Sequence, residues 1–527
     1  MHPVQTFELL MVMLVAIIAL HFLAHKFGLP PAVALLAGGS LLAFIPGAPT
    51  VSLDPELILV VFLPPLLMDG AWFTPLAHFR RHLVGICSLA VGAVIFTTAV
   101  VAVVTHWLVP SLPWAACAAL GAIVSPPDAV SAKAVLQRVR LPKRLATLLE
   151  GESLLNDATG LVLFRFAVAA AISGSFSMLD AVGSFAVLTI GGVAVGAAIG
   201  ALWVLLVRKL LDEYLIIAAS VLTCWLAYIA GEMLHVSGVI ATVTTGLVCG
   251  WFQHVVFSAH VRVRAVGFWT VFVFLLEALV FILIGSSLRG VVERMGGLGS
   301  IVEQMGLPIL LIVLAMTLAR LAWVYASDLL LLLLQRLGLT QKPSLGLKSA
   351  TIVGWAGMRG VVTLAVALSL PEDMPGRDFM LISAFAVIFA TVLIQGMTLG
   401  PLIRWLGVKE VEARHTRFSR SQAEAAVAQA QLATVERHAY AEDGGLLHPK
   451  LLAQYQRQAS AAANYSGNEE HYAADVQAHF NVVLAAIAAG RLELIRLHRA
   501  GEIDDETLHA LEHDLDLEEI SAVAAKS

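Results

Sequence analysis

The chain has 527 residues, of which 59% are hydrophobic and only 13% are charged, whereas a soluble domain carries about 25% charged residues. Acidic side chains outnumber basic ones by 38 to 33. This composition excludes a single soluble enzyme core and a nucleic-acid-binding protein, and it predicts an all-α protein that crosses a membrane many times.

Apolar runs long enough to cross a bilayer, which takes about 20 residues, predict thirteen transmembrane helices. The expected ranges are 4–24, 31–46, 53–72, 83–108, 113–136, 146–173, 180–207, 213–233, 236–254, 267–289, 306–335, 348–370 and 378–406. The first run lacks the basic start and the cleavage site of a signal peptide, so we expect it to remain as a helix.

The basic residues between these spans predict the orientation of the chain, because cytosolic loops are enriched in Lys and Arg. With the C-terminus inside, the inside loops receive 14 basic residues and the outside loops receive three. We therefore predict an outside N-terminus and a cytosolic C-terminus.

The fifth span contains two prolines and an acid in the segment GAIVSPPDAVSAKAV. Pro126 and Pro127 cannot donate backbone hydrogen bonds, so we expect the helix to break near Ser125. A broken helix frees carbonyl groups for a cation, and Asp128 adds a negative charge at the same place. The alternative is a proline kink capped by Asp128, but a kink alone needs no acid at bilayer depth.

The sixth span carries three carboxylates, those of Glu150, Glu152 and Asp157, within eight residues of an apolar helix. Ionisable residues at this depth are costly and mark ion or proton paths. Ser153 and Asp157 are four residues apart and share a helix face, and Glu152 and Asn156 form the adjacent pair. The pattern predicts that this helix contributes to an ion site.

Two lone basic residues and one glycine stripe leave alternatives open. Arg165, two turns beyond Asp157, is expected to be a structural counter-charge or a side chain that extends to the interface. Lys133 in the fifth span either extends to the basic loop or perturbs a cation site. The stripe favours tight helix packing, within the chain or in a dimer; it consists of Gly192, Gly196 and Gly200 in the seventh span.

The twelfth span places Arg359 among Gly354, Gly357 and Gly360. Three glycines at this spacing weaken a helix and allow close backbone approach, so we predict a second interrupted helix with a fixed cation at the break. Spans 5 and 12 occupy the same position in two six-helix repeats, helices 1–6 and 8–13. Broken helices at corresponding positions of two inverted repeats are typical of a transporter site.

The composition changes near Val411. Residues 411–527 hold 10 basic and 18 acidic side chains, whereas residues 1–410 hold 23 and 20. Ala-rich and Leu-containing segments between polar breaks favour helices in this tail. We predict a membrane domain over residues 1–410 and a small, helical, cytosolic C-terminal domain over residues 411–527.

Five segments of the chain, in this order, resemble the sodium/proton exchangers, the electroneutral branch of the monovalent cation/proton antiporters. They are FLPPLLMDGAWF (62–73), GAIVSPPDAV (121–130), GESLLNDA (151–158), EALVFILIG (277–285) and WAGMRGVV (355–362). The most specific of them is GESLLNDA, with its Asn-Asp pair. The resemblance covers most of residues 1–406 and implies a membrane antiporter rather than an enzyme.

The resemblance implies which residues bind the ions. Asp157 would be the carboxylate that alternately binds a cation and a proton, and Asp128, Ser153 and a carbonyl of the broken helix would complete the Na⁺ shell. Asn156 would hold the half-helices by hydrogen bonds. Because an amide does not titrate, Asn156 favours exchange of one cation for one proton.

The resemblance also implies the residues that support the site. Glu152 would form a buried ion pair with Arg359. Glu277 would stabilise the site or the interface between moving parts, and Pro126 and Pro127 would keep the fifth helix open. The transport bundle would carry helices 5, 6, 12 and 13.

The function that follows is exchange of Na⁺ or Li⁺ for H⁺ across the cell (inner) membrane by alternating access, for pH and sodium homeostasis. The resemblance implies a homodimer in membrane lipid, without a cofactor. Potassium/proton exchange by the same fold is the main alternative. A cation channel and an intramembrane enzyme are weaker alternatives, because the sequence offers neither a repeated filter loop nor a Ser/His or His-rich metal pattern.

Overall fold

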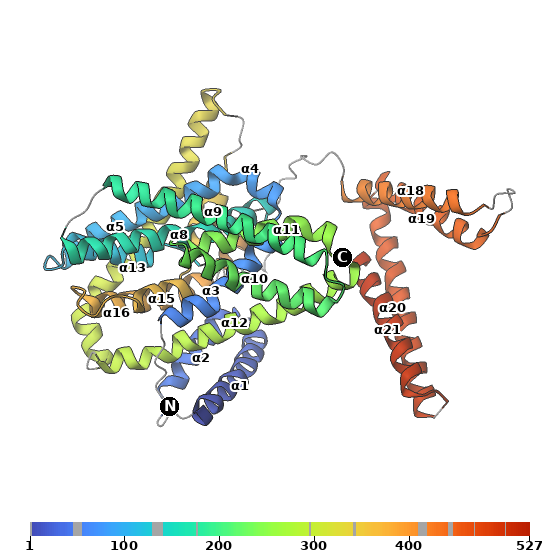
Figure 1. Cartoon of the computed structure of the whole chain (residues 1–527), viewed down its shortest axis with the longest axis horizontal. Coiled ribbons are helices and arrows are strands. Elements are labelled where there is room, and N and C mark those ends of the chain that lie inside the picture. The colour runs from blue at the N-terminus through green and yellow to red at the C-terminus, as the bar shows by residue number, and fades with distance from the viewer. Residues whose placement is uncertain are drawn as a thin grey trace. The chain divides into compact units, whose positions relative to one another are not determined.

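A computed structural model describes residues 3–45, 55–128, 141–174, 178–294, 297–340, 344–408, 419–440, 446–467, 469–500 and 502–526 (Figure 1). The chain divides into two compact units, Met1–Val411 and Glu412–Ser527. The regular structure of the described residues is helical, apart from one isolated β-bridge between Tyr440 and Leu446.

The first unit consists of α-helices and two short π-helical segments, η1 and η2. In chain order they are α1 (Pro3–Phe27), α2 (Pro31–Ala43), α3 (Pro55–Phe73), α4 (Leu76–Cys87), η1 (Ser88–Ala93), α5 (Val94–Leu108), α6 (Trp114–Val124), α8 (Lys143–Ser173), α9 (Met178–Val207), α10 (Glu213–Met233), α11 (Gly238–Val256), α12 (Ala259–Arg294), α13 (Leu298–Arg336), α14 (Leu347–Trp355), α15 (Val361–Leu368), α16 (Arg377–Ala390), η2 (Thr391–Gln395) and α17 (Gly396–Leu406).

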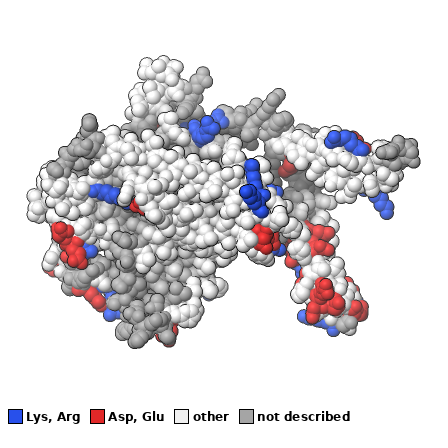
Figure 2. All heavy atoms as spheres, viewed as in Figure 1, with Lys and Arg blue, Asp and Glu red and all other residues white. Residues whose placement is uncertain are grey.

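The helices of the first unit have the length and the surface of membrane-spanning elements. In the described part of the chain, eight helices are long and apolar enough to cross a bilayer, and four shorter helices are also apolar. Large apolar side chains such as Ile18, Leu222 and Leu310 are more than half exposed, and Figure 2 shows a largely uncharged surface over this unit. The chain is a polytopic membrane protein, while the number thirteen stays a prediction.

The first unit packs as two bundles, which we call the first and the second bundle. The first bundle contains α4, η1, α5, α6, α8 and α13 to α17, and the second contains α1 to α3 and α9 to α12. The bundles meet where α15 packs on α3 and α12 and where α8 packs on α11. Apolar side chains fill the first of these contacts, with Val361 and Leu364 beside Ile58 and Phe62.

The glycine stripe of α9 packs against α11 within the chain. A Cβ at Gly196 would overlap the carbonyl oxygen of Ala241, and one at Gly192 would lie 2.9 Å from that of Ser237. The Thr245 hydroxyl donates to the Gly196 carbonyl at 2.9 Å. The stripe therefore permits close helix packing inside the second bundle, which was one of the two predicted alternatives.

The second unit consists of two helical hairpins. Its helices are α18 (Arg420–His438), α19 (Pro449–Gly467), α20 (Glu469–Arg499) and α21 (Asp505–Lys526). Ala428, Leu432 and Leu452 form a small core between α18 and α19. Arg491 of α20 pairs with Asp516 and Glu519 of α21. The helical structure predicted for this tail is confirmed for its described residues.

Candidate functional site

Two interrupted segments meet inside the first bundle. Helix α6 ends at Val124, and α14 and α15 are separated by the non-helical residues Ala356–Gly360. The predicted end of the helix near Ser125 and the predicted break around Arg359 are confirmed, while residues 129–140 lie outside the described residues. The Asp128 amide donates to the Met358 carbonyl at 2.7 Å, so the backbones of the two breaks are joined directly.

The carboxylate of Asp128 lies against the Cα of Gly360. A Cβ at Gly360 would overlap the Oδ2 atom of Asp128. Glycine at this position therefore lets the second break approach the acid that follows the first break, which is the close approach expected from the sequence.

Arg359 holds the two breaks together through backbone carbonyls. Its Nε atom donates to Val124 O at 2.8 Å and its Nη2 atom to Ser125 O at 3.0 Å, and Nη1 donates to Gly357 O. The side chain is 1% exposed. Carbonyl groups at the end of a helix lose their helical N–H partners. The guanidinium carries five N–H donors and bonds to these carbonyls instead.

Glu152 is paired with Arg320 of α13, so the predicted ion pair between Glu152 and Arg359 is wrong. The Glu152 carboxylate accepts from Arg320 Nη1 at 2.5 Å and from Nη2 at 2.9 Å, and Nη2 also donates to Val353 O at 3.1 Å. The physical reason is that Arg359 is occupied by the carbonyls of the breaks, whereas Arg320 meets the carboxylate in a bidentate geometry.

Helix α8 contacts the first break through Asn156 and Gly160. The Asn156 amide donates to the Pro127 carbonyl at 2.6 Å, and Gly160 leaves no room for a Cβ beside the Pro126 ring. Asn156 is fully buried, and its Oδ1 atom has no hydrogen-bond partner among the described residues. The proline break and the Asn-Asp motif thus form one contact.

The two acids of the candidate site each follow directly after a residue of the Asn156–Pro127 hydrogen bond. Asp157 is 6% exposed and Ser153, one turn earlier on α8, is 7% exposed, and Asp128 is half-buried. Carboxylate, hydroxyl and carbonyl oxygens are the ligands that hard cations prefer. The candidate site therefore contains the types of oxygen atom that a site for a monovalent cation needs.

Several predicted residues lie elsewhere or outside the described residues. Glu277 is half-buried on α12, in the second bundle. Glu150 is exposed near the start of α8. Lys133 lies outside the described residues.

Sequence reasoning missed three buried charged residues. Arg320 and Asp328 on α13 and Asp69 on α3 are between 2% and 6% exposed. The Asp328 carboxylate accepts from the Leu345 and Gly346 amides at 2.5 and 3.1 Å, just before α14. The sequence does contain a signal for these three residues, because each is an ionisable residue inside an apolar run.

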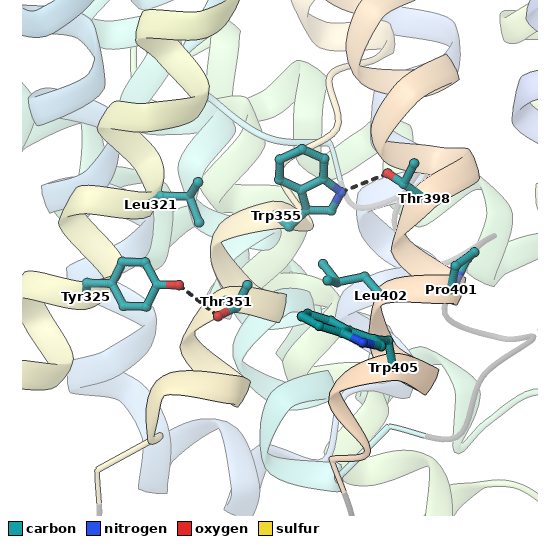
Figure 3. Close-up of a pocket in the computed structure, with 8 residues that line it drawn as sticks. All are labelled: Leu321, Tyr325, Thr351, Trp355, Thr398, Pro401, Leu402 and Trp405. Atoms are coloured by element: carbon teal, nitrogen blue, oxygen red, sulfur yellow. Dashed lines mark hydrogen bonds between the residues drawn. The ribbon is translucent and has the colours of Figure 1, made fainter.

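One cavity among the described residues is large enough to hold a small molecule but does not include the acids. It measures about 530 Å³ and lies between α13, α14 and α17 (Figure 3). Two pairs of its polar side chains are hydrogen-bonded, Tyr325 with Thr351 at 2.7 Å and Trp355 with Thr398 at 3.0 Å. With no charged group in its lining, this cavity does not resemble a cation site.

Comparison with known proteins points to one family. The family model described as "Sodium/hydrogen exchanger, transmembrane" matches residues 10–405. The chain is 31% identical over 524 residues to an uncharacterized Na⁺/H⁺ exchanger of Mycobacterium tuberculosis (strain ATCC 25618 / H37Rv), covering 94% of this chain and 93% of the relative.

A second relative is named for four transported cations. It is the sodium, potassium, lithium and rubidium/H⁺ antiporter of Bacillus subtilis (strain 168), 33% identical over 407 residues, which cover 74% of this chain and 60% of the relative. Among solved structures, the sodium proton antiporter MjNhaP1 from Methanocaldococcus jannaschii matches with a TM-score of 0.61 at 20% identity. The match covers 78% of this chain and 100% of that one, and it confirms the all-α antiporter fold.

Proposed function

The chain belongs to the sodium/hydrogen exchanger family, a family of secondary transporters rather than enzymes, and we propose that it exchanges Na⁺ or Li⁺ for H⁺ by alternating access. The observation that carries the proposal is the pair of acids, Asp157 and Asp128, at the crossing of two broken helices. This family moves a monovalent cation and a proton without a cofactor.

Asp157 binds the two ions in turn. A bare carboxylate in the membrane interior is costly, so Asp157 is occupied either by the cation or by the proton. Asp128, Ser153 and a carbonyl of the broken helix complete the cation shell with oxygen ligands. Competition for one carboxylate couples the two ion movements.

The buried charges support exchange of one cation for one proton. The segments that meet at the crossing carry the acids Asp128, Glu152 and Asp157 and the guanidiniums of Arg320, which pairs with Glu152, and of Arg359, which bonds to backbone carbonyls. Among the described residues of these segments, the three acids and two guanidiniums leave one negative charge, which one monovalent cation or one proton neutralises. Asn156 cannot add a second proton, because its amide does not titrate.

Potassium/proton exchange is the second candidate function. It is favoured by the Bacillus subtilis relative, whose name includes potassium and rubidium beside sodium and lithium. Both candidates use the same carboxylates, and they differ in the size of the cation that the shell accepts.

The protein as a whole acts as a homodimer in the cell (inner) membrane and serves pH and sodium homeostasis. The basic loops favour an outside N-terminus and a cytosolic tail. In this proposal the first bundle, which carries the acids, moves against the second bundle during alternating access.

The test compares the activity of several cations in proteoliposomes. Collapse of a preformed pH gradient is measured on addition of Li⁺, Na⁺, K⁺ or choline, for the wild type and for Asp157→Asn. We expect Na⁺ and Li⁺ to collapse the gradient in the wild type and no cation to do so in Asp157→Asn. Exchange at the wild-type rate in a folded Asp157→Asn protein would contradict the proposal.

A further inference from the structure

One peptide unit connects η2 to the acid of the first break. The N–H of Arg359 donates to the Thr391 hydroxyl oxygen at 3.0 Å. The carbonyl of the same peptide unit, that of Met358, accepts from the Asp128 amide at 2.7 Å. Thr391 and Asp128 therefore hold opposite ends of one rigid plane.

The Thr391 hydroxyl can only accept, and not donate, in its hydrogen bond with the Arg359 N–H. Its proton goes to the Val387 carbonyl at 2.8 Å or to that of Ile388 at 3.3 Å. A hydroxyl has one proton to donate, so the oxygen remains to accept from Arg359. The side chain is 1% exposed, so water cannot easily replace it.

The position of the Asp128 carboxylate depends on the same backbone. Gly360, the next residue after Arg359, has its Cα against Oδ2 of Asp128. A rotation of the Met358–Arg359 peptide plane would therefore move two groups beside Asp128. These are the Met358 carbonyl, which accepts from the Asp128 amide, and the Gly360 backbone, which lies against the Asp128 carboxylate. Buried hydrogen bonds in such a chain also strengthen one another.

We propose that Thr391 is a positioning residue that holds Asp128 in place through the Met358–Arg359 peptide unit and thereby sets the affinity for the cation. This inference rests on the proposed function, because it assigns to Asp128 a share of the cation shell. Thr391 itself does not touch the cation.

The test compares three substitutions at position 391. Thr391→Val keeps the shape but removes the acceptor, Thr391→Ser keeps the hydroxyl, and Thr391→Cys leaves a weak acceptor. Thr317→Val on α13 is the matched control, because the Thr317 hydroxyl donates to the Val313 carbonyl of its own helix at 2.9 Å.

Two readouts separate affinity from turnover. The first is Na⁺-dependent collapse of a pH gradient in proteoliposomes, and the second is the rise of the melting temperature with Na⁺ in detergent. For Thr391→Val we expect the apparent KM for Na⁺ to rise about tenfold, the size of one lost buried hydrogen bond, with kcat changed less than about twofold. Thr391→Ser and Thr317→Val should resemble the wild type, and Thr391→Cys should be intermediate.

The inference is overturned if Thr391→Val has the wild-type KM while the wild type exchanges ions. It is also overturned if Thr391→Ser and Thr391→Val lose kcat equally at an unchanged KM, since that marks a purely structural role. If Thr391→Val does not fold, a wild-type KM in Thr391→Cys overturns it. Absence of exchange in the wild type would instead refute the proposed function.

Discussion

At the scale of single residues, Gly360 is a position where the addition of one methyl group has a large predicted effect. A Cβ there would overlap the Asp128 carboxylate, and overpacking a buried site costs about 1–3 kcal/mol. We expect Gly360→Ala to lower the melting temperature in detergent and to abolish Na⁺-dependent exchange.

The control is Gly267→Ala on α12, where a Cβ would meet nothing within 4 Å. This variant should keep the wild-type rate and be as stable as the wild type or slightly more so, because alanine is the better helix former. Wild-type stability and exchange in Gly360→Ala would show that the two breaks do not approach each other as described.

The sequence could identify the residue types of the candidate site but not all of their partners. Asp128 and Asp157 were evident because acids inside apolar runs are rare. The partner of Glu152 was predicted wrongly, since spacing along the chain cannot tell which of two arginines on different helices reaches a carboxylate. That assignment depends on Arg359 being engaged by Val124 and Ser125 carbonyls.

At the scale of helices, the Glu152–Arg320 pair links α8, α13 and α14. Both side chains are at most 3% exposed, so removing one partner strands a buried charge, which costs about 3–5 kcal/mol. We expect Glu152→Gln and Arg320→Gln each to lower thermal stability strongly, and the double substitution to cost clearly less than the sum of the two.

The matched control is the exposed pair of Arg165 on α8 and Glu232 on α10, which joins the two bundles at 3.2 Å. Surface pairs contribute about 0–1 kcal/mol, so the same substitutions there should have small effects. A double-mutant cycle for Glu152 and Arg320 without coupling would mean that the two residues are not in contact.

Helix breaks were predictable and the π-helical turns were not. Two consecutive prolines before Asp128 and glycines at a spacing of three around Arg359 each weaken a helix. The prolines alone are not decisive, because Pro64 and Pro65 lie inside the continuous helix α3. By contrast, η1 contains only one glycine, Gly92, and η2 contains neither glycine nor proline. Their geometry arises from packing, so the role of Thr391 could not be inferred from the sequence.

At the scale of the whole molecule, the balance of buried charges predicts electroneutral exchange. One net charge moved per cycle would couple to the membrane potential by about 2.3 kcal/mol per 100 mV, roughly a 50-fold bias. We expect a Na⁺ concentration jump on proteoliposomes adsorbed to an electrode to change the internal pH without a sustained current.

Asp157→Asn proteoliposomes provide the baseline for both signals in this experiment. A sustained current that depends on Na⁺ and exceeds this baseline would mean that another group carries a proton. Asp128 would then be the first residue to test, because it is the acid that interacts electrostatically with Asp157.

The most direct test of the account is whether the cation and the proton compete for one carboxylate. The apparent KM for Na⁺ is measured in proteoliposomes over a series of pH values, with the maximal rate determined at each. Mass action predicts that, where the carboxyl is mostly protonated, KM rises about tenfold for each unit that the pH falls, at a constant maximal rate. A KM that stays constant while the maximal rate changes with pH would contradict a shared carboxylate at Asp157.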